Sequence, residues 1–188
     1  MSNNVIINNN LIQDVCPLCS GNQIYPIGKI PCPNDLMYSS TAIRLMRRPE
    51  LWRCRSCRSG FIQQAVNDQD AEKLYRTSDS SKRWVSSALF EERKTENLVA
   101  VMRNAFQSGK TVLDLGCNAG DLLDFAKKHG CATYGMEFSA AAAALCSQKG
   151  HTIITGFDSV NFRFDVITAF DLIEHVYDVN DFLCIGTC

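Results

Sequence analysis

The second half of the chain alternates short apolar runs with segments whose apolar residues recur at helical spacing. These segments predict two helices, over residues 120–129 and 140–148. The apolar runs predict four strands, at residues 111–115, 132–138, 151–155 and 164–169. Because short connections join the strands through helices, we predict an α/β fold with a parallel sheet covered by helices.

The first half of the chain has a different pattern. Residues 1–13 are rich in asparagine, and we expect a disordered N-terminus there. Residues 14–62 hold five of the ten cysteines and are rich in proline, which is typical of a small module without a large core. Residues 63–108 predict a polar linker with a short helix near residues 71–75, followed by an amphipathic helical segment over residues 84–106.

Composition excludes several classes of protein. With 46% hydrophobic and 21% charged residues, the 188-residue chain can bury a core and is not disordered overall. The balance of 19 Lys+Arg against 20 Asp+Glu argues against a broadly basic nucleic-acid binder. No apolar run has the length of a membrane span, and the N-terminus does not resemble a signal peptide. We therefore expect a cytoplasmic protein with no membrane contact, in which cysteines favour metal binding over disulfides.

Two Cys-x-x-Cys pairs stand out among the ten cysteines. Cys16 with Cys19, and Cys54 with Cys57, can turn four thiolates toward one ion, which predicts a closed structural zinc site. A redox pair is the alternative for a single Cys-x-x-Cys, but the flanking sequence predicts no thioredoxin-like strand-to-helix turn. We expect Cys32, between the two pairs, to be a spare thiol.

Arginines make residues 44–58 locally basic. The simplest interpretation is a solvated surface that balances the charge of the metal-bound thiolates. The alternative is contact with phosphate, in nucleic acid or in a nucleotide-linked substrate. The arginines concerned are Arg44, Arg47, Arg48, Arg53, Arg55 and Arg58.

A glycine-containing loop follows the first predicted strand of the sheet. Gly116 and Gly120 allow backbone conformations and close ligand approach that other residues forbid. Asp114 and Asp121 flank the loop and disfavour a phosphate, so a cationic or polyhydroxylated ligand fits better. Glu137 ends the second predicted strand, where an acidic residue accepts hydrogen bonds from ribose hydroxyls.

Residues 112–120, Glu137 and residues 164–176 resemble motifs I, II and IV of class I S-adenosylmethionine-dependent methyltransferases. Residues 14–62 are similar to the zinc-binding segment that precedes sugar C-methyltransferase-like proteins of this class. The resemblance implies an incomplete Rossmann-like methyltransferase fold preceded by a zinc-ribbon-like module. The implied division is a disordered N-terminus at residues 1–13, a zinc-ribbon-like module at 14–62, a linker and amphipathic helix at 63–108, and the N-terminal half of the cofactor-binding domain at 109–188.

The resemblance also implies a set of cofactor-binding residues. Gly116, Cys117 and Gly120 would pass the methionine part of S-adenosylmethionine along their backbone. Glu137 would bind the ribose, and Phe138 would pack on the adenine. The full set is Asp114, Gly116, Cys117, Asn118, Gly120, Glu137, Phe138, Asp158, Phe170 and Asp171.

Glu174 and His175 are the candidate catalytic residues. A neutral imidazole can take a proton from a hydroxyl or a carbon acid, and an adjacent carboxylate can orient it. Two alternatives stay open: His175 packs locally, or nearby acids hold a divalent metal, as in quinone O-methyltransferase-like members of the class.

The resemblance implies methyl transfer from S-adenosylmethionine to a small-molecule acceptor such as a nucleotide-linked sugar, with structural zinc as the second cofactor. Sugar carbon, sugar or quinone oxygen, and RNA base are all open as acceptor atoms. The family would continue past the fourth strand, so we expect this chain to be truncated there and impaired as an isolated enzyme. The alternative function is a non-catalytic zinc-ribbon and Rossmann-like protein that binds nucleic acid or a protein partner.

Overall fold

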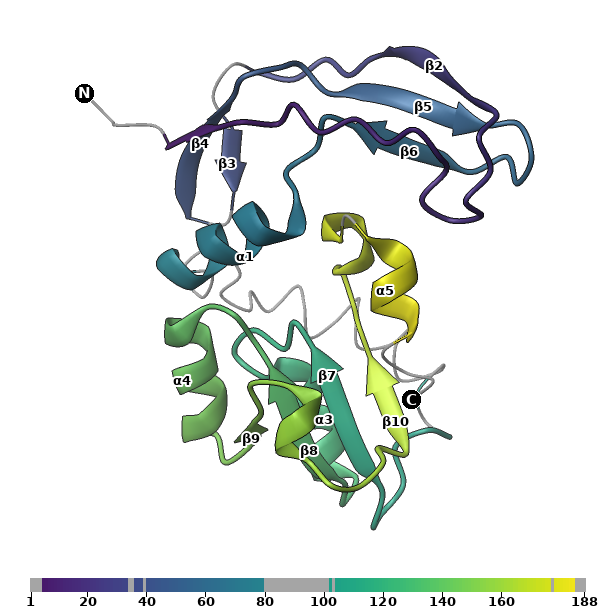
Figure 1. The fold of residues 1–188 in the computed structure, drawn as a ribbon. Coiled ribbons are helices and arrows are strands. Elements are labelled where there is room, and N and C mark those ends of the chain that lie inside the picture. The colour runs from purple at the N-terminus through teal and green to yellow at the C-terminus, as the bar shows by residue number, and fades with distance from the viewer. Residues whose placement is uncertain are drawn as a thin grey trace. The chain divides into compact units, whose positions relative to one another are not determined.

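The computed structural model describes residues 5–33, 36–38, 40–79, 102, 104–176 and 178–184 of the chain. The chain forms two compact units, drawn in Figure 1. Met1–Leu74 and Ile173–Cys188 form one, here called the cysteine-rich unit, and Tyr75–Leu172 form the other, here called the parallel-sheet unit. Most of the amphipathic helix predicted over residues 84–106 lies outside the described residues.

The parallel-sheet unit contains a four-stranded sheet with all neighbours parallel, in the spatial order β10-β7-β8-β9. Its strands are β7 (Thr111–Leu115), β8 (Ala132–Met136), β9 (Thr152–Ile153) and β10 (Val166–Thr168). Its helices are α3 (Asp121–Lys128), α4 (Ala140–Gln148) and the short 3-10 helix η3 (Phe157–Ser159). The predicted parallel α/β sheet is thereby confirmed, although the second, third and fourth strands are two or three residues shorter than expected.

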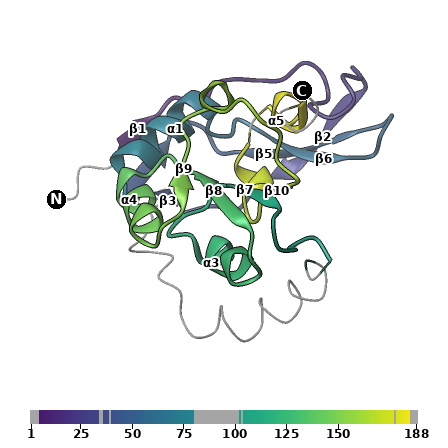
Figure 2. The same cartoon turned by 90° about the horizontal axis from the view of Figure 1, so that it is seen from below.

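The core of this unit explains why its central strand is so apolar. Val112 and Leu113 of β7 are fully buried, as expected for a central parallel strand whose two faces are both covered. Leu123 of α3 and Cys146 of α4 join Val112 in one buried cluster, so both helices pack on the sheet. Figure 2 shows α3 running along one face of the sheet. The apolar pattern of the sequence therefore fixes the framework that carries the loops at the strand ends.

The cysteine-rich unit contains two three-stranded sheets. The first, in the order β2-β5-β6, is antiparallel and consists of β2 (Ile24–Lys29), β5 (Glu50–Cys54) and β6 (Gly60–Gln63). The second, in the order β1-β4-β3, consists of β1 (Val5–Ile7), β4 (Thr41–Leu45) and β3 (Leu36–Tyr38). Helical elements complete the unit: most of α1 (Asp68–Thr77), η4 (Ile173–His175) and α5 (Val179–Cys184).

The N-terminal segment differs from the disordered tail expected for residues 1–13. Strand β1 pairs in parallel with β4, and Ile7 is buried against Ile43. The Asn9 side chain is also buried: its Oδ1 accepts from the Arg47 backbone N–H at 2.8 Å, and its Nδ2 donates to the Gln64 carbonyl at 2.6 Å. The Asn9 side chain thus forms hydrogen bonds with backbone groups of two distant segments, a role that an asparagine-rich composition does not reveal.

The C-terminal segment also differs from expectation. The sequence places residues 109–188 in one domain, whereas residues from Ile173 onward belong to the cysteine-rich unit. The Asn180 side-chain amide donates to the Pro17 carbonyl at 2.5 Å, and the Asp178 backbone N–H donates to Asp68 Oδ2 at 3.1 Å. None of the helices in the described part of the chain has the length and apolar character that crossing a membrane requires.

Candidate functional site

The loop between β7 and α3 adopts a succession of left-handed backbone conformations. The φ angles are 71° at Gly116, 46° at Asn118 and 82° at Gly120. A Cβ at Gly120 would lie 2.7 Å from the Cys146 sulfur, so only glycine fits both the angle and the space. The Gly116 backbone N–H donates to the Met136 carbonyl at 2.9 Å, which ties the loop to the end of β8.

Glu137, one residue beyond β8, is held by two backbone donors. The Asn118 N–H donates to its Oε2 at 3.0 Å, and the Ser139 N–H donates to its Oε1 at 2.7 Å. Partial burial raises the pKa of Glu137 even though these hydrogen bonds lower it. Each carboxylate oxygen has a further lone pair, so the group is positioned to accept hydrogen bonds from a ligand's hydroxyls. Ser139 also caps α4, because its Oγ accepts from the Ala142 N–H.

Asp114 is a buried carboxyl at the same end of the sheet. Burial raises its pKa to about 7; the hydrogen bond from Thr168 Oγ1 to its Oδ1, at 2.7 Å, lowers the pKa, and the charge of Glu137 raises it. Thr168 lies opposite Asp114 in the β10–β7 register. Thr168 was not identified as a site residue from the sequence. Its role becomes visible only when the ends of β10 and β7 are paired.

The residues of this loop fit a ligand that donates hydrogen bonds. Asn118 Oδ1 is buried and has no hydrogen-bond partner among the described residues. An orphaned buried acceptor is costly unless a donor arrives. The site therefore suits a polyhydroxylated or cationic ligand, as expected from the sequence.

The other predicted cofactor residues lie around this loop with different exposures. Phe138 is 43% exposed, and the Arg76 guanidinium lies 5.3 Å from its ring centroid. Cys117 is buried with its sulfur 3.8 Å from that of Cys146, and this contact and burial raise its pKa. Only the Cys117 backbone is therefore placed to meet a ligand.

The segment after β10 passes close to the glycine loop. A Cβ added at Gly116 would lie 3.2 Å from Leu172 Cδ1, which brings the neighbouring Phe170 and Asp171 to this end of the sheet. Phe170 is exposed, and Asp171 has a left-handed φ of 50°. Asp158 is exposed on η3, and no described contact joins it to the loop.

Glu174 and His175 lie on η4, which belongs to the cysteine-rich unit. Both are exposed, and the His175 ring meets that of Tyr38 edge-on at a centroid distance of 6.3 Å. This packing corresponds to the alternative interpretation of His175. A catalytic role for the two residues stays a prediction.

The four cysteines of the two knuckles come together in the cysteine-rich unit. Their sulfur atoms all lie within 4.8 Å of one another, with Cys16 to Cys57 at 3.6 Å and Cys19 to Cys54 at 3.7 Å. A tetrahedral site with Zn–S bonds of about 2.3 Å has sulfur–sulfur edges of about 3.8 Å, so the cluster has the dimensions of a zinc site. The nine cysteines of the described residues form no disulfide.

Hydrogen bonds favour the thiolate form at two of the four cysteines, Cys54 and Cys57. Ser59 Oγ lies 3.0 Å from the Cys57 sulfur, and the side chain and backbone of Ser59 lower the pKa of Cys57 to about 6. A backbone hydrogen bond from Cys57 likewise lowers the pKa of Cys54. At Cys19 a backbone hydrogen bond from Gly21 is outweighed by the neighbouring sulfurs, and the pKa is raised to about 12. A bound cation would stabilise all four thiolates together.

Comparison with known proteins identifies the parallel sheet. Residues 89–184 match a family model described as a methyltransferase domain. The chain is 40% identical over 91 residues to a ubiquinone biosynthesis O-methyltransferase of Bradyrhizobium sp. (strain ORS 278), covering 43% of this chain and 35% of the relative. The protein of the same name from Rhodopseudomonas palustris (strain BisB5) is 39% identical over 90 residues, with the same two coverages. The chain thus spans about a third of the length of these curated relatives.

Among solved structures, the chain is similar to magnesium protoporphyrin IX methyltransferase of Synechocystis PCC 6803 with bound SAM. That similarity has 18% identity and a TM-score of 0.48, and it covers 59% of this chain and 65% of the other. The finer resemblance to sugar C-methyltransferases stays a prediction, because the curated relatives named above are O-methyltransferases. Since the family model covers just over half of the residues, the chain belongs to the class I S-adenosylmethionine-dependent methyltransferase family.

Proposed function

We propose that the whole protein transfers a methyl group from S-adenosylmethionine to a small-molecule acceptor, with the cofactor held by the parallel-sheet unit. The observation that carries the proposal is the loop at Gly116–Gly120. Its left-handed backbone, the fixed carboxylate of Glu137 and the orphaned Asn118 oxygen together present hydrogen-bond acceptors to a ligand.

S-adenosylmethionine supplies an activated methyl group, so the protein mainly has to align the reactants and accept one proton. In this proposal the backbone from Gly116 to Asn118 borders the methionine part of the cofactor. Glu137 accepts from the ribose hydroxyls, and the exposed ring of Phe138 packs on the adenine. Asp114 positions the loop, and a nearby ammonium group would favour its ionised form.

Two acceptor classes are compatible with the proposal. The curated relatives are named for ubiquinone biosynthesis, which favours a hydroxyl on a quinone-type ring. The resemblance of the cysteine-rich segment favours a nucleotide-linked sugar. In either case we assign His175 as the base that takes the acceptor's proton and Glu174 as the carboxylate that orients or charge-balances it.

We also propose that Cys16, Cys19, Cys54 and Cys57 bind one structural zinc ion. The support is the match between the measured sulfur separations and the edges of a tetrahedral site. With four protein ligands the site has no open position for a substrate, so it would stabilise the fold rather than catalyse. A reducing compartment such as the cytoplasm would keep the four thiols available.

Cofactor binding by isothermal titration calorimetry tests the proposal. We expect the chain to bind S-adenosylmethionine and Glu137→Gln to bind it at least tenfold more weakly, because charge-assisted hydrogen bonds contribute about 1.5–3 kcal/mol. Asp14→Asn is the matched control, because it removes one exposed carboxylate from the cysteine-rich unit. Absence of binding by the folded, unmutated chain would instead support a non-catalytic binding protein.

A further inference from the structure

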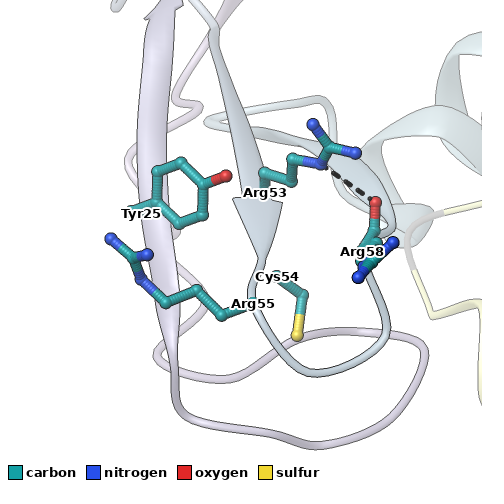
Figure 3. Close-up of a pocket in the computed structure, with 5 residues that line it drawn as sticks. All are labelled: Tyr25, Arg53, Cys54, Arg55 and Arg58. Atoms are coloured by element: carbon teal, nitrogen blue, oxygen red, sulfur yellow. Dashed lines mark hydrogen bonds between the residues drawn. The ribbon is translucent and has the colours of Figure 1, made fainter.

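A hollow of about 310 Å³ lies on the antiparallel sheet of the cysteine-rich unit, outside the cofactor loop. Figure 3 shows the residues that line it: Tyr25 on β2, Arg53 and Cys54 on β5, and Arg55 and Arg58 in the turn that follows. Three of these five residues carry a guanidinium group. The hollow is therefore a concentration of positive charge on a chain whose net charge is only −1.

Contacts within the unit hold two of the guanidinium groups in place. Arg53 Nε donates to the Arg58 carbonyl at 3.2 Å, and the Arg55 guanidinium lies 4.5 Å from the centroid of the Tyr25 ring (Figure 3). Tyr25 is in turn the cross-strand partner of Arg53. A guanidinium has five N–H donors in a rigid fork, so these contacts orient the groups and leave most of their donors available.

No carboxylate of the described residues neutralises these charges. None of the three arginines lies within 4.0 Å of a carboxylate oxygen of those residues. Like charges brought together without a counter-charge repel one another, and an anion placed between them removes that cost.

The arginines are not hydrogen-bonded to the metal-binding cysteines. The sulfur contacts come from other cysteines, from Ser59 and from backbone groups. In Figure 3 the Cys54 sulfur points away from the Arg53 guanidinium. The Arg53 guanidinium is thus directed away from the Cys54 thiolate, so balancing the charge of the metal site does not by itself account for its position.

We propose that this hollow binds the phosphate or diphosphate group of a small molecule. Guanidinium groups match phosphate oxygens in shape and can donate to them in pairs. A volume of about 310 Å³ lies at the lower end of the range for small-molecule sites, roughly 300–1,000 Å³, and is suited to such a group. The proposal concerns the cysteine-rich unit alone and stands whether or not the chain transfers methyl groups.

Titration of the full, zinc-loaded chain with inorganic pyrophosphate tests the proposal. We expect saturable binding that weakens about tenfold or more in Arg53→Gln and in Arg55→Gln, and that weakens between 50 and 200 mM salt. Arg58→Lys keeps the charge but loses the planar fork, so its binding should be intermediate. Arg48→Gln is the matched control: it removes one exposed arginine of the same unit outside the hollow, and its affinity should change less than twofold.

Three outcomes would overturn the proposal. The first is no saturable binding of pyrophosphate by the folded chain. The second is an equal loss of affinity in Arg48→Gln, which would mean diffuse attraction rather than a site. The third is tight binding of a single-stranded oligonucleotide without binding of pyrophosphate, which would assign the arginines to nucleic acid. Zinc content, measured for every variant, separates a lost site from a lost fold.

Discussion

Replacing Asp114 by asparagine should remove a pH-dependent cost that the buried carboxyl imposes on the free protein. Asparagine retains the oxygen that accepts from Thr168 Oγ1, and it cannot ionise. The variant therefore separates the charge of Asp114 from its place in the packing.

The magnitude follows from the pKa of the carboxyl. The folded pKa of about 7 lies above the ordinary pKa of 3.8 for an aspartate side chain, so the native state holds its proton more tightly than the unfolded chain does. Native stability is then greatest below pH 4 and falls as the pH rises through 7, and the full cost of about 4 kcal/mol is reached above the folded pKa. Roughly 3 kcal/mol of that cost accrues between pH 5 and pH 8.

Urea denaturation at pH 5 and pH 8, with amide exchange of Leu113 in β7 as a local probe, measures this difference. Between pH 5 and pH 8 the free energy of unfolding should fall in both proteins or in the unmutated chain alone. We expect the fall to be about 3 kcal/mol smaller in Asp114→Asn than in the unmutated chain. The asparagine amide leaves a new buried donor that costs about 1–3 kcal/mol, but this cost is the same at both pH values. Parallel pH profiles for the two proteins would refute the assignment of a charged, buried Asp114.

Asp165 provides a control of opposite sign. A backbone hydrogen bond and then a side-chain hydrogen bond from Thr111 lower the pKa of this exposed carboxyl. The stability that it contributes is present above pH 4 and lost as the pH falls through its folded pKa. Asp165→Asn should therefore reduce stability at neutral pH and have little effect in acid.

Two further substitutions test the metal cluster and the glycine loop. Cys16→Ser should lose the single zinc ion measured by elemental analysis of purified protein, whereas Cys32→Ser, outside the cluster, should retain it; zinc-free protein with an unchanged fold would contradict the structural role. Gly120→Ala should lower the free energy of unfolding by about 2–4 kcal/mol in urea denaturation, because its Cβ would lie 2.7 Å from the Cys146 sulfur at a φ of 82°. Gly28→Ala, with nothing within 4 Å of its Cβ, should have a much smaller effect, and equal losses would point away from steric overlap.

The parts of the fold that sequence predicts are those in which local pattern and burial agree. Strand β7 and helix α4 have the predicted bounds, because one is a buried apolar run and the other an alanine-rich segment capped by Ser139. The sheet of β1, β3 and β4 was not predicted, since two of its three strands are three residues long and its register depends on distant segments. Local pattern has no information about such pairings.

In the candidate site, too, the residues that follow from local sequence are predicted and those that depend on long-range strand pairing are not. The glycine loop and Glu137 are found from sequence, because each follows a predicted strand at a spacing that chemistry requires. Thr168 is not found, because its contact with Asp114 exists only once β10 and β7 are in register. The arginine hollow is predictable only in part. The sequence indicates a basic segment, but only the pairing of β2 with β5 brings Tyr25 beside Arg53.

The division of the chain into units has a consequence for how it folds. The parallel-sheet unit described here is one continuous stretch, Tyr75–Leu172, so no other segment interrupts it. The cysteine-rich unit is discontinuous, and the hydrogen bond between Asn180 and Pro17 joins residues 163 positions apart. Closing so long a loop carries an entropic cost that local contacts avoid. During synthesis, the first segment of the cysteine-rich unit therefore cannot make these contacts until the intervening parallel-sheet segment has been made.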